Sequence, residues 1–347
     1  MNVPRRLVIF YFSGTGNSKR VALWLAEFAR AKGVPAIIHS MINTNPATVD
    51  LSGALIVFIS PVHGFNFPPI TLNFISRFPP GANDVLLMNT RGGFKVGNHV
   101  TPGLTGVAFM FAHLRLRLKG YHVVGAVPFD MPSNWFILHP VPAPEKVQFI
   151  HNRNRERLAQ YAGKLFSGRP LFIARRDIIQ DIFIAPVALA YYCIGRFWLA
   201  KQFYASSGCD NCGICISRCP VDAIRDDGGR PYWTLNCESC MKCMNGCPEQ
   251  AIDIGHGFII TLTLLALPVA GLLSAFLPGG GDSGLMNTLV VAAVTLALLT
   301  GAYRLRHRLL KHPWYVKLAE WTSLTHYRFW GKRMAKPPTS GKSNDNN

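Results

Sequence analysis

The chain has 347 residues, enough for two or three domains. It carries 36 Lys and Arg against 18 Asp and Glu, a formal net charge of +18, yet 49% of its residues are hydrophobic and its mean hydropathy is +0.18. This combination argues against a purely soluble protein and predicts basic soluble surfaces joined to membrane-embedded segments. No secretory signal is expected, because the apolar run at 7–12 is too short for one and continues into glycines.

The first expected elements are a strand at 7–12 and a helix that ends near Gly33, joined by a loop rich in glycine and hydroxyl groups. Such a junction forms a phosphate site, because backbone N–H groups converge on the anion at a helix N-terminus. The spacing excludes a P-loop, since the lysine follows Ser18. It also excludes the dinucleotide fingerprint, since only Gly14 and Gly16 fit, so no NAD(P)H site is detected.

This loop resembles the phosphate loop of flavodoxins, Ser/Thr-x-Thr-Gly-x-Ser/Thr. The resemblance implies that the loop binds the phosphate of FMN without a lysine. The residues assigned to this role are Ser13, Gly14, Thr15, Gly16, Asn17 and Ser18. An ordinary capped strand–helix junction remains the alternative.

Apolar runs of strand length alternate with helical stretches along the rest of the first 170 residues. Strands are expected at 36–39, 54–59, 85–88 and 123–127, and helices near 69–78 and 102–119. This alternation predicts an α/β domain over 1–170 with a flavodoxin-like, doubly wound parallel sheet. In such a sheet the ligand lies beyond the carboxyl ends of the strands, at the point where the strand order reverses.

Two loops at that edge are expected to flank the flavin ring through residues 60–67 and 90–98, as the equivalent loops do in flavodoxin-like proteins. The residues assigned to the ring are Pro61, Val62, His63, Gly64, Phe65, Thr90, Arg91, Gly92, Gly93 and Phe94. The two glycines would let backbone N–H groups approach the flavin. Rings that could stack on it are Phe65, Phe67, Phe94 and Trp135, although burial in the core is the ordinary fate of a phenylalanine. Flavodoxins are commonly acidic and this domain is basic, which puts the usual partner surface in doubt but not the flavin site.

Residues 171–207 are interpreted as a linker. Within it, 182–200 approach the length that spans a bilayer, but Pro186, Gly195 and Arg196 interrupt the run. A helix docked on the protein or lying on the membrane surface is therefore expected. The run also contains Cys193, which has no metal-ligand spacing and is expected to be a buried, inert thiol.

The next segment contains two copies of one cysteine pattern, offset by 28 positions. The first is Cys209, Cys212, Cys215 and Cys219 followed by proline, and the second is Cys237, Cys240, Cys243 and Cys247 followed by proline. Eight thiolates at this spacing are what two [4Fe–4S] clusters require, with the fourth cysteine of each run crossing to the other cluster. The expected ligand sets are Cys209, Cys212, Cys215 and Cys247, and Cys237, Cys240, Cys243 and Cys219. A pair of zinc sites is the alternative, which four cysteines in a row plus proline disfavour.

This pattern resembles the bacterial two-cluster ferredoxins over 208–254. The resemblance implies a small βαβ-like module with pseudo-two-fold symmetry, whose clusters are close enough for electron tunnelling. The order of the segments is similar to that of the flavodoxin–ferredoxin fusion proteins of anaerobic bacteria and archaea. That likeness covers residues 1–254 well and the hydrophobic segment that follows only loosely, and it indicates little about substrates.

Two uncharged stretches, 258–277 and 285–303, are each about long enough to span a bilayer, and they predict a transmembrane helical hairpin over 258–303. Buried core helices are the alternative. Basic residues follow the second stretch, so both ends should face the cytoplasm, as should the tail at 304–347. Oxygen-sensitive clusters also favour a reducing compartment. We therefore expect the inner (cytoplasmic) membrane, with the soluble domains and the C-terminus on the cytoplasmic side.

The tail mixes aromatic and basic residues, which suits lipid headgroups, and nucleic-acid binding is not expected.

These features predict a membrane-anchored electron-transfer flavo-iron-sulfur protein that passes electrons between FMN, two [4Fe–4S] clusters and an external redox protein. The positive charge favours an acidic ferredoxin or flavodoxin as the partner, and a membrane redox subunit is the other candidate. One alternative is a flavin-dependent reductase of a small molecule or quinone, fed by the clusters. Another is a redox-sensing or structural subunit of a membrane complex. No catalytic residue is assigned.

Overall fold

The computed structural model describes residues 3–135, 139–197, 201–276 and 283–326. The chain divides into two compact units, one built mainly from the residues up to Arg196 and the other mainly from Phe197 onward.

The first unit is built on a sheet of five parallel strands in the order β2-β1-β3-β4-β7. The strands are β1 (Leu7–Tyr11), β2 (Ala36–Ser40), β3 (Leu55–Pro61), β4 (Asp84–Gly93) and β7 (His122–Pro132). This is the flavodoxin-like order 2-1-3-4-5, so the predicted fold class is confirmed for this domain. Strands β4 and β7 run further than expected, because Thr90–Gly93 pair with Phe129–Pro132 beyond the apolar run that marked them in the sequence.

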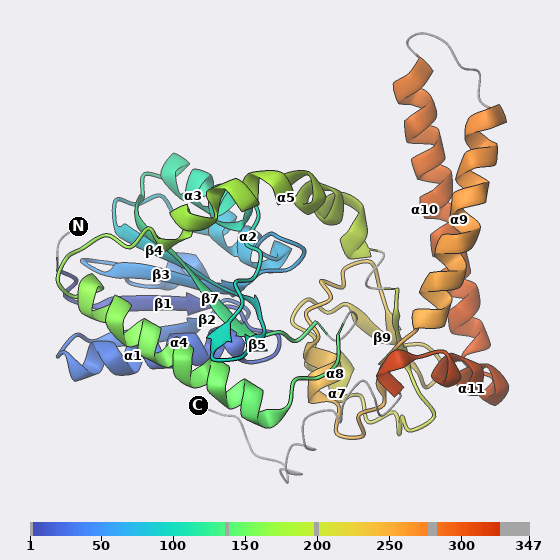
Figure 1. Ribbon diagram of the computed structural model, residues 1–347, viewed down its shortest axis with the longest axis horizontal. Coiled ribbons are helices and arrows are strands. Elements are labelled where there is room, and N and C mark those ends of the chain that lie inside the picture. The colour runs from blue at the N-terminus through green and yellow to red at the C-terminus, as the bar shows by residue number, and fades with distance from the viewer. Residues whose placement is uncertain (1–2, 136–138, 198–200, 277–282, 327–347) are drawn as a thin grey trace. The chain divides into compact units, whose positions relative to one another are not determined.

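Helices cover both faces of this sheet (Figure 1). One face is covered by α1 (Asn17–Ala31) and α4 (Pro144–Leu165), and the other by α2 (Pro69–Arg77) and α3 (Ala108–Leu118). Side chains alternate along the strands, so Leu7 and Ile9 pack toward the first pair of helices and Val8 and Phe10 toward the second.

Two helices of this unit differ from expectation. Helix α3 begins at Ala108 instead of near 102, because Pro102, Gly103 and Gly106 precede it and Gly106 has a φ of +61°. Part of the loop before it forms a small hairpin of β5 (Lys95–Val96) and β6 (His99–Val100). Helix α4 was not anticipated, since its sequence is mostly polar and its buried residues are few: Ile150, Asn154, Leu158, Ala162 and Leu165.

The linker forms a further layer on the first unit. A 3₁₀ turn (η2, Ile173–Asp177) leads into α5 (Ile178–Ala190), and a π-helical turn (η3, Tyr191–Gly195) follows. Ala174 in η2 and Tyr192 in η3, on either side of α5, pack against the core beneath α2 and α3. The expectation that Cys193 is buried is wrong: its side chain is exposed, because this helix turns apolar residues outward.

The second unit opens with two copies of a strand–helix–strand motif. The first copy is β8 (Phe203–Ala205), α7 (Ile214–Ser217) and β9 (Ile224–Asp226), and the second is β10 (Pro231–Trp233), α8 (Lys242–Gly246) and β11 (Ile252–Ile254). Each element of the second copy begins 28 residues after its counterpart. Strand β8 pairs with β11 and β9 pairs with β10, both antiparallel. The repeat in the sequence is therefore a repeat in the backbone.

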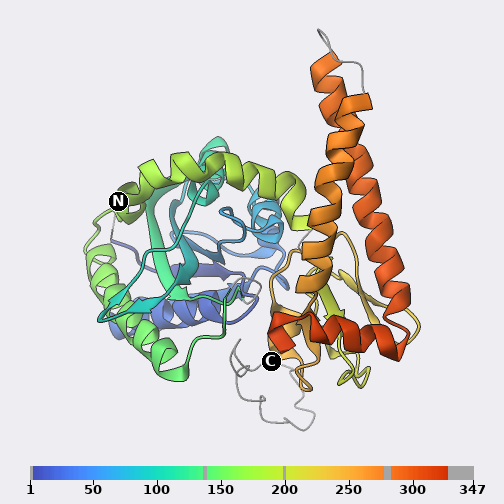
Figure 2. The same ribbon diagram turned by 45° about the vertical axis from the view of Figure 1, so that its right-hand side comes forward.

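Two long helices follow in the second unit: α9 (His256–Phe276) and α10 (Ser283–Leu309). They run side by side in Figures 1 and 2. Among the described residues, one stretch, Asn287–Leu309, is long and apolar enough to cross a membrane, and a shorter apolar stretch covers His256–Leu265. By length and composition this is a weak indication of membrane association, and the turn of the expected hairpin lies partly outside the described residues.

The start of the tail packs on the two-copy motif instead of extending away from it. Helix α11 (Pro313–Trp321) buries Val316 and Ala319 against Tyr204 of β8, and Leu310 joins the same cluster. Its outer aromatic residues, Trp314 and Trp321, are exposed. A 3₁₀ turn (η4, Leu324–His326) ends the described chain, so the part of the basic and aromatic tail from 327 onward lies outside the described residues.

Candidate cofactor sites

The loop between β1 and α1, the candidate phosphate loop, lies at the carboxyl edge of the sheet. Gly16 precedes α1 with a φ of +99°, and no side chain caps the helix. The Gly16 N–H donates to Ser13 Oγ at 3.0 Å, while within the described chain no acceptor meets the N–H groups of Asn17 or Ser18. No carboxylate lies in the first helical turn. Free N–H groups at the positive end of a helix fit a phosphate monoester such as that of FMN.

The polar side chains of this loop bind mostly to the protein itself. Ser18 Oγ lies 2.8 Å from Thr90 Oγ1 in a buried pair, and Asn17 Nδ2 donates to the carbonyl of Pro132 at 2.9 Å. Thr15 Oγ1 accepts a hydrogen bond from Asn134, a residue not picked from the sequence. These bonds hold the loop against β4 and the end of β7. A phosphate would therefore be bound chiefly by backbone N–H groups.

The loop after β3 carries an unusual backbone conformation. His63 and Asn66 exchange two backbone hydrogen bonds, of 2.8 and 3.2 Å, across a turn in which Gly64 and Phe65 have φ values of +52° and +65°. A phenylalanine rarely adopts this left-handed conformation, and such residues gather at functional sites. Val62 also donates its N–H to the carbonyl of Thr90 at 2.9 Å. The two loops expected to flank the ring, after β3 and along the end of β4, thus lie side by side.

Arg91 was expected near the flavin ring, and its guanidinium is instead bound within the protein. Nε donates to Asp130 Oδ1 at 2.7 Å, and Nη1 donates to Asp177 Oδ2 at 2.6 Å and to Thr105 Oγ1 at 3.0 Å. The Arg91 side chain is 4% exposed. Asp130 is also bonded by Arg157 Nη1 at 3.2 Å. This network, which the sequence did not reveal, joins β4, β7, α4 and the linker.

The other ring candidates fall into two groups. Phe67 is buried in the core and its ring packs edge-on against Phe109 at 5.8 Å, so its ring is not available to a cofactor. Phe65, Phe94 and Trp135 are at least partly exposed and remain candidates. Trp135 is the last described residue before a short undescribed stretch.

Gly92 and Gly93 are required by packing inside the protein. A Cβ at Gly92 would lie 2.9 Å from Ser133 Oγ, and one at Gly93 would lie 2.9 Å from side-chain carbons of both Asp130 and Val100. The close approach that these glycines permit is therefore between β4 and its neighbours. Whether their N–H groups also meet a flavin stays a prediction.

The cysteine loops have the same backbone conformation in both copies. Left-handed residues occur at Asn211, Gly213 and Asp222 in the first copy and, 28 positions on, at Ser239, Met241 and Gln250 in the second. Five of these six are not glycine, which marks a backbone held in an unfavourable conformation by its surroundings. Loops curled in this way turn successive N–H groups and cysteine sulfurs toward one centre.

The fourth cysteine of each run accepts a backbone hydrogen bond at its sulfur. The N–H of Ala223 donates to Cys219 Sγ at 3.3 Å, and the N–H of Ala251 donates to Cys247 Sγ at 3.3 Å. Hydrogen bonds to sulfur stabilise the negative charge of a thiolate and tune the potential of a cluster that it binds. Both bonds are formed by the alanine that recurs four residues after the cysteine in each copy.

Cys215 shows which sulfurs come together. Burial, together with charge on Cys209, Cys247 and Cys212, raises the pKa of its thiol to about 11. Three of these four cysteines belong to the first run and Cys247 belongs to the second, which is the crossed set expected for one cluster. Among the described residues, no three His, Cys, Asp or Glu side chains converge as the ligands of a single metal ion would.

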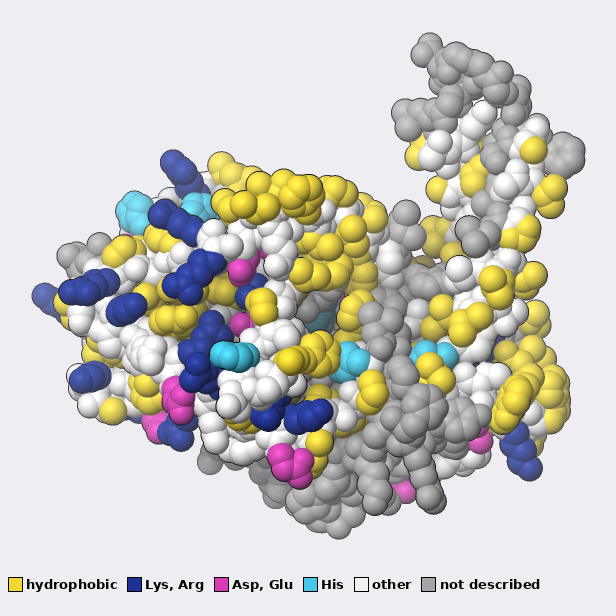
Figure 3. All heavy atoms as spheres, viewed as in Figure 1, with side chains coloured by type: hydrophobic (Ala, Val, Ile, Leu, Met, Phe, Trp, Pro, Cys, Tyr) yellow, Lys and Arg dark blue, Asp and Glu magenta, His cyan; other side chains and the backbone are white. Residues whose placement is uncertain are grey.

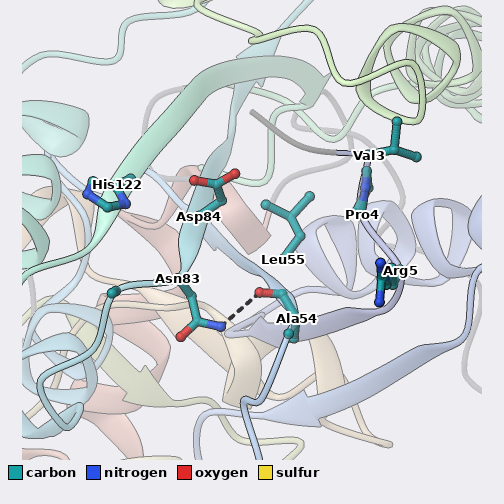
Figure 4. Close-up of a pocket in the computed structure, with 10 residues that line it drawn as sticks. Val3, Pro4, Arg5, Ala54, Leu55, Asn83, Asp84 and His122 are labelled. Carbon is teal, nitrogen blue, oxygen red and sulfur yellow. Dashed lines mark hydrogen bonds between the residues drawn. The ribbon is translucent and has the colours of Figure 1, made fainter.

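A separate hollow of about 1110 Å³ lies at the opposite edge of the sheet (Figure 4). Its lining includes the first residues of three strands, Leu55, Asp84 and His122, together with Asn83, which donates a hydrogen bond to Ala54 O at 3.0 Å. In doubly wound sheets the ligand lies at the carboxyl edge, so this hollow at the amino edge is not the expected cofactor site.

Comparison with known proteins identifies one domain by its sequence. The model of the 4Fe-4S dicluster domain matches residues 208–252. No curated protein matches the chain.

Solved structures resemble the first unit at low identity. A flavodoxin from the domain Archaea is 16% identical over 46% of this chain and 99% of its own, with a TM-score of 0.29. The oxidised Flavodoxin 1 from Bacillus cereus is 15% identical over 47% and 97%, with a TM-score of 0.33. The rubredoxin oxygen:oxidoreductase of Desulfovibrio gigas is 18% identical, with a TM-score of 0.30, and the match covers 46% of this chain and only 37% of that protein. The flavodoxin-like assignment therefore depends on the strand order of the sheet.

The strand order and the cysteine domain together define the type of protein. A flavodoxin-like domain suggests FMN, and a 4Fe–4S domain suggests at least one iron–sulfur cluster. The chain joins a flavodoxin-like domain to a ferredoxin-type 4Fe–4S domain, a combination that suggests an electron-transfer flavo-iron-sulfur protein.

Proposed function

We propose that this chain is a membrane-anchored electron-transfer protein that passes electrons between FMN, two [4Fe–4S] clusters and an external redox protein. The observation that carries the proposal is the doubled cysteine motif, with equivalent left-handed residues and equivalent N–H···S bonds in each copy. A motif repeated in backbone detail supports two clusters and not one. The free N–H groups at the start of α1 support FMN as a further cofactor of the same chain.

The two kinds of cofactor divide the chemistry between them. FMN converts two-electron into one-electron transfers, whereas a cubane carries one electron at a time. The residues of this chain bind and orient them: Cys219 and Cys247 link the two halves of the cluster domain by crossing, and the N–H groups of Ala223 and Ala251 stabilise charge on the crossing sulfurs. No residue is needed as an acid or base for the transfer itself.

Cofactor content is the direct test of this composition. After anaerobic purification we expect about eight iron, about eight sulfide and about one FMN per chain. Stoichiometric zinc with negligible sulfide would contradict the cluster assignment.

Thr15→Glu should empty the flavin site, because it places a carboxylate beside the phosphate. Thr48→Glu, on an exposed turn, is the matched control and should keep its flavin. Full flavin in Thr15→Glu would mean that the phosphate binds elsewhere.

The external partner follows from charge. A net charge of +18 favours an acidic redox protein, because opposite charges steer the two proteins together and raise the association rate. We expect electron transfer to an acidic ferredoxin or flavodoxin to slow steeply as salt concentration rises. A rate independent of salt would favour a membrane redox subunit as the partner.

The membrane anchor is supported by the apolar stretch Asn287–Leu309 and by the arginines Arg304, Arg306 and Arg308 near its end. Positive residues favour the cytoplasmic side. A reporter fused after residue 347 should therefore behave as cytoplasmic in cells that contain an inner membrane. A periplasmic signal from this fusion would contradict the proposed orientation.

Electron relay is distinguished from flavin-dependent reduction of a small molecule by removing one cluster ligand. In a relay, Cys240→Ala should lose reduction of the protein acceptor even when FMN is still bound. The matched control is Cys193→Ala, which removes the one cysteine outside the two runs and should have no effect. If Cys240→Ala kept full turnover with an artificial donor that feeds the flavin, the chain would be a reductase and not a relay.

A further inference from the structure

Helix α5 has its polar side chains on the inside and its apolar side chains on the outside. Of its 13 residues only Gln180 and Asp181 are polar. Gln180 Nε2 donates to the carbonyl of Gly103 at 3.3 Å, and Asp181 Oδ1 accepts the N–H of Gly106 at 2.7 Å. Both side chains are therefore bound to the loop that precedes α3.

The opposite side of α5 is a continuous apolar stripe. Phe183 is 80% exposed and Ile179 is 69% exposed, and the stripe also includes Ile178, Ile182, Val187 and Leu189. Figure 3 shows hydrophobic side chains gathered over this helix. A surface helix in contact with water has the reverse arrangement, with its apolar side against the core. An apolar stripe turned outward therefore marks a surface that meets something other than water.

Helix α3 adds a second apolar row on the same side of the sheet. Met110, Leu114 and Leu118 are spaced by four residues and are 58%, 54% and 78% exposed. Both helices lie over the same side of the sheet in Figures 1 and 2, and the Asp181–Gly106 bond joins α5 to the loop that precedes α3. We call the two rows together the α5 face.

The charges at the border of the α5 face are positive. Arg175 and Arg176 are exposed just before α5, and Arg117 is exposed on α3. None of these three pairs with a carboxylate in the part of the chain that the structure describes. The nearby carboxylates turn inward, Asp177 to Arg91 and Asp181 to Gly106. Unpaired arginines beside an apolar stripe complement an anionic surface with an apolar interior.

We infer that the α5 face lies in the headgroup layer of an anionic lipid bilayer. The apolar rows would enter the acyl boundary, and the arginines would bind lipid phosphates. A protein partner is less suited to this surface, because interfaces between proteins carry hydrogen bonds and the outer side of α5 offers no polar side chain. This contact goes beyond the proposed function, since it brings the flavodoxin-like domain itself to the membrane, independently of α9 and α10.

The test uses the full chain with an environment-sensitive fluorophore on a single introduced cysteine. Cys193→Ala is the background, and labelling is anaerobic so that the cluster cysteines stay ligated. Ile182→Cys reports the α5 face. Leu23→Cys, 50% exposed on α1 over the other side of the sheet, is the matched control. Leu264→Cys, 64% exposed on α9, reports whether the helix pair enters the bilayer.

The protein is reconstituted with vesicles of mixed phosphatidylglycerol and phosphatidylcholine that contain nitroxide-labelled lipid. At position 182 we expect blue-shifted emission and quenching by about twofold or more, with no quenching at position 23. Replacing both Arg175 and Arg176 with Gln, or omitting the anionic lipid, should reduce the quenching at position 182.

Three outcomes would overturn the inference. Quenching at position 264 without quenching at 182 would mean that only the helix pair meets lipid. Blue-shifted emission at 182 without quenching would mean that protein covers the stripe, and absence of both changes would mean that it faces water. Quenching at 182 without quenching at 264 would uphold the α5 face and contradict the proposed anchor, so the two proposals fail separately.

Discussion

The flavodoxin-like sheet and the ferredoxin-type motif differ in what fills their interiors. The strands of the sheet are five to eleven residues long, and most of their side chains are buried hydrocarbon. Each strand of the ferredoxin-type motif has three residues. Seven of its eight motif cysteines are neither fully buried nor fully exposed, and Cys212 is exposed.

The difference shows what each cofactor contributes to its own domain. In the sheet, FMN would be an addition at edge loops, and the hydrophobic core exists without it. In the ferredoxin-type motif, the hydrophobic core is small and includes Phe203, Ile224 and Trp233, and left-handed residues lie in the loops of the cysteines that would hold a cluster. Loss of cofactor should therefore have unequal consequences for the two domains.

Removal of iron should unfold the ferredoxin-type motif and leave the sheet intact. Treating the purified protein with an iron chelator should abolish hydrogen-exchange protection in β8–β11, because three-residue strands around a small hydrophobic core cannot hold the motif without its cluster. Amides of β1, β3 and β4 should keep their protection and serve as the internal control. Surviving protection across 203–254 after complete loss of iron would show that this motif has a sufficient core of its own.

Arg91→Leu should be the most damaging single change within the sheet domain. It leaves Asp177 without a cation and Asp130 with Arg157 alone, which costs about 3–5 kcal/mol of unfolding free energy. The control is Arg155→Leu, which breaks an exposed pair with Glu27 and should cost less than about 1 kcal/mol. Urea denaturation followed by circular dichroism measures both. Equal losses in the two variants would mean that the Arg91 network adds nothing beyond a surface ion pair.

Removal of FMN should destabilise the sheet domain without unfolding it. A ligand present at about 100 to 1,000 times its Kd stabilises the native state by about 3–4 kcal/mol, and this is the loss expected on release of the flavin. The apoprotein should keep its far-ultraviolet circular dichroism and the exchange protection of the central strands. Collapse of both signals would show that the flavin, like the clusters, belongs to the core.

Mild acid should destabilise the sheet domain slightly through His151. Burial, together with the charge of Arg20, lowers the pKa of His151 from 6.5 to about 4. As pH falls from 6.5 toward 4, the unfolded chain binds a proton that the folded chain does not, so stability decreases over this window. His151→Gln should flatten the pH dependence of the melting temperature, and His99→Gln, an exposed control, should not. An unchanged slope in His151→Gln would exclude this histidine as the cause.

How far the sequence could predict the fold depended on whether a feature was local. The cysteine spacing and its 28-residue repeat lie within a short segment, and the comparison by sequence identifies the same segment, 208–252. The five strands of the sheet were also predicted, because apolar runs of strand length that alternate with helical stretches are typical of a parallel sheet. Helix α4 was not predicted, because only one narrow side of it is buried and most of its sequence resembles a solvated surface.

The sites were less predictable, because a residue's role depends on what lies opposite it. Arg91 looked like a flavin contact from its loop, and the structure places its guanidinium between Asp130 and Asp177, which are 39 and 86 residues further along the chain. Phe67 looked like a stacking ring and lies in the core, while Cys193 looked buried and is exposed. Each of these outcomes depends on contacts between distant segments.

By itself the sequence determined the cluster-binding pattern, the phosphate-type loop and the α/β class, because spacing along the chain and the period of apolar residues set them. Only the tertiary structure decided which side chains hold the protein together and which remain for a cofactor or a membrane. Helix α5 shows the physical reason. Its sequence is apolar almost throughout and does not indicate which side faces outward. The hydrogen bonds of Gln180 and Asp181 to the loop before α3 decide that the apolar side chains point away from the protein.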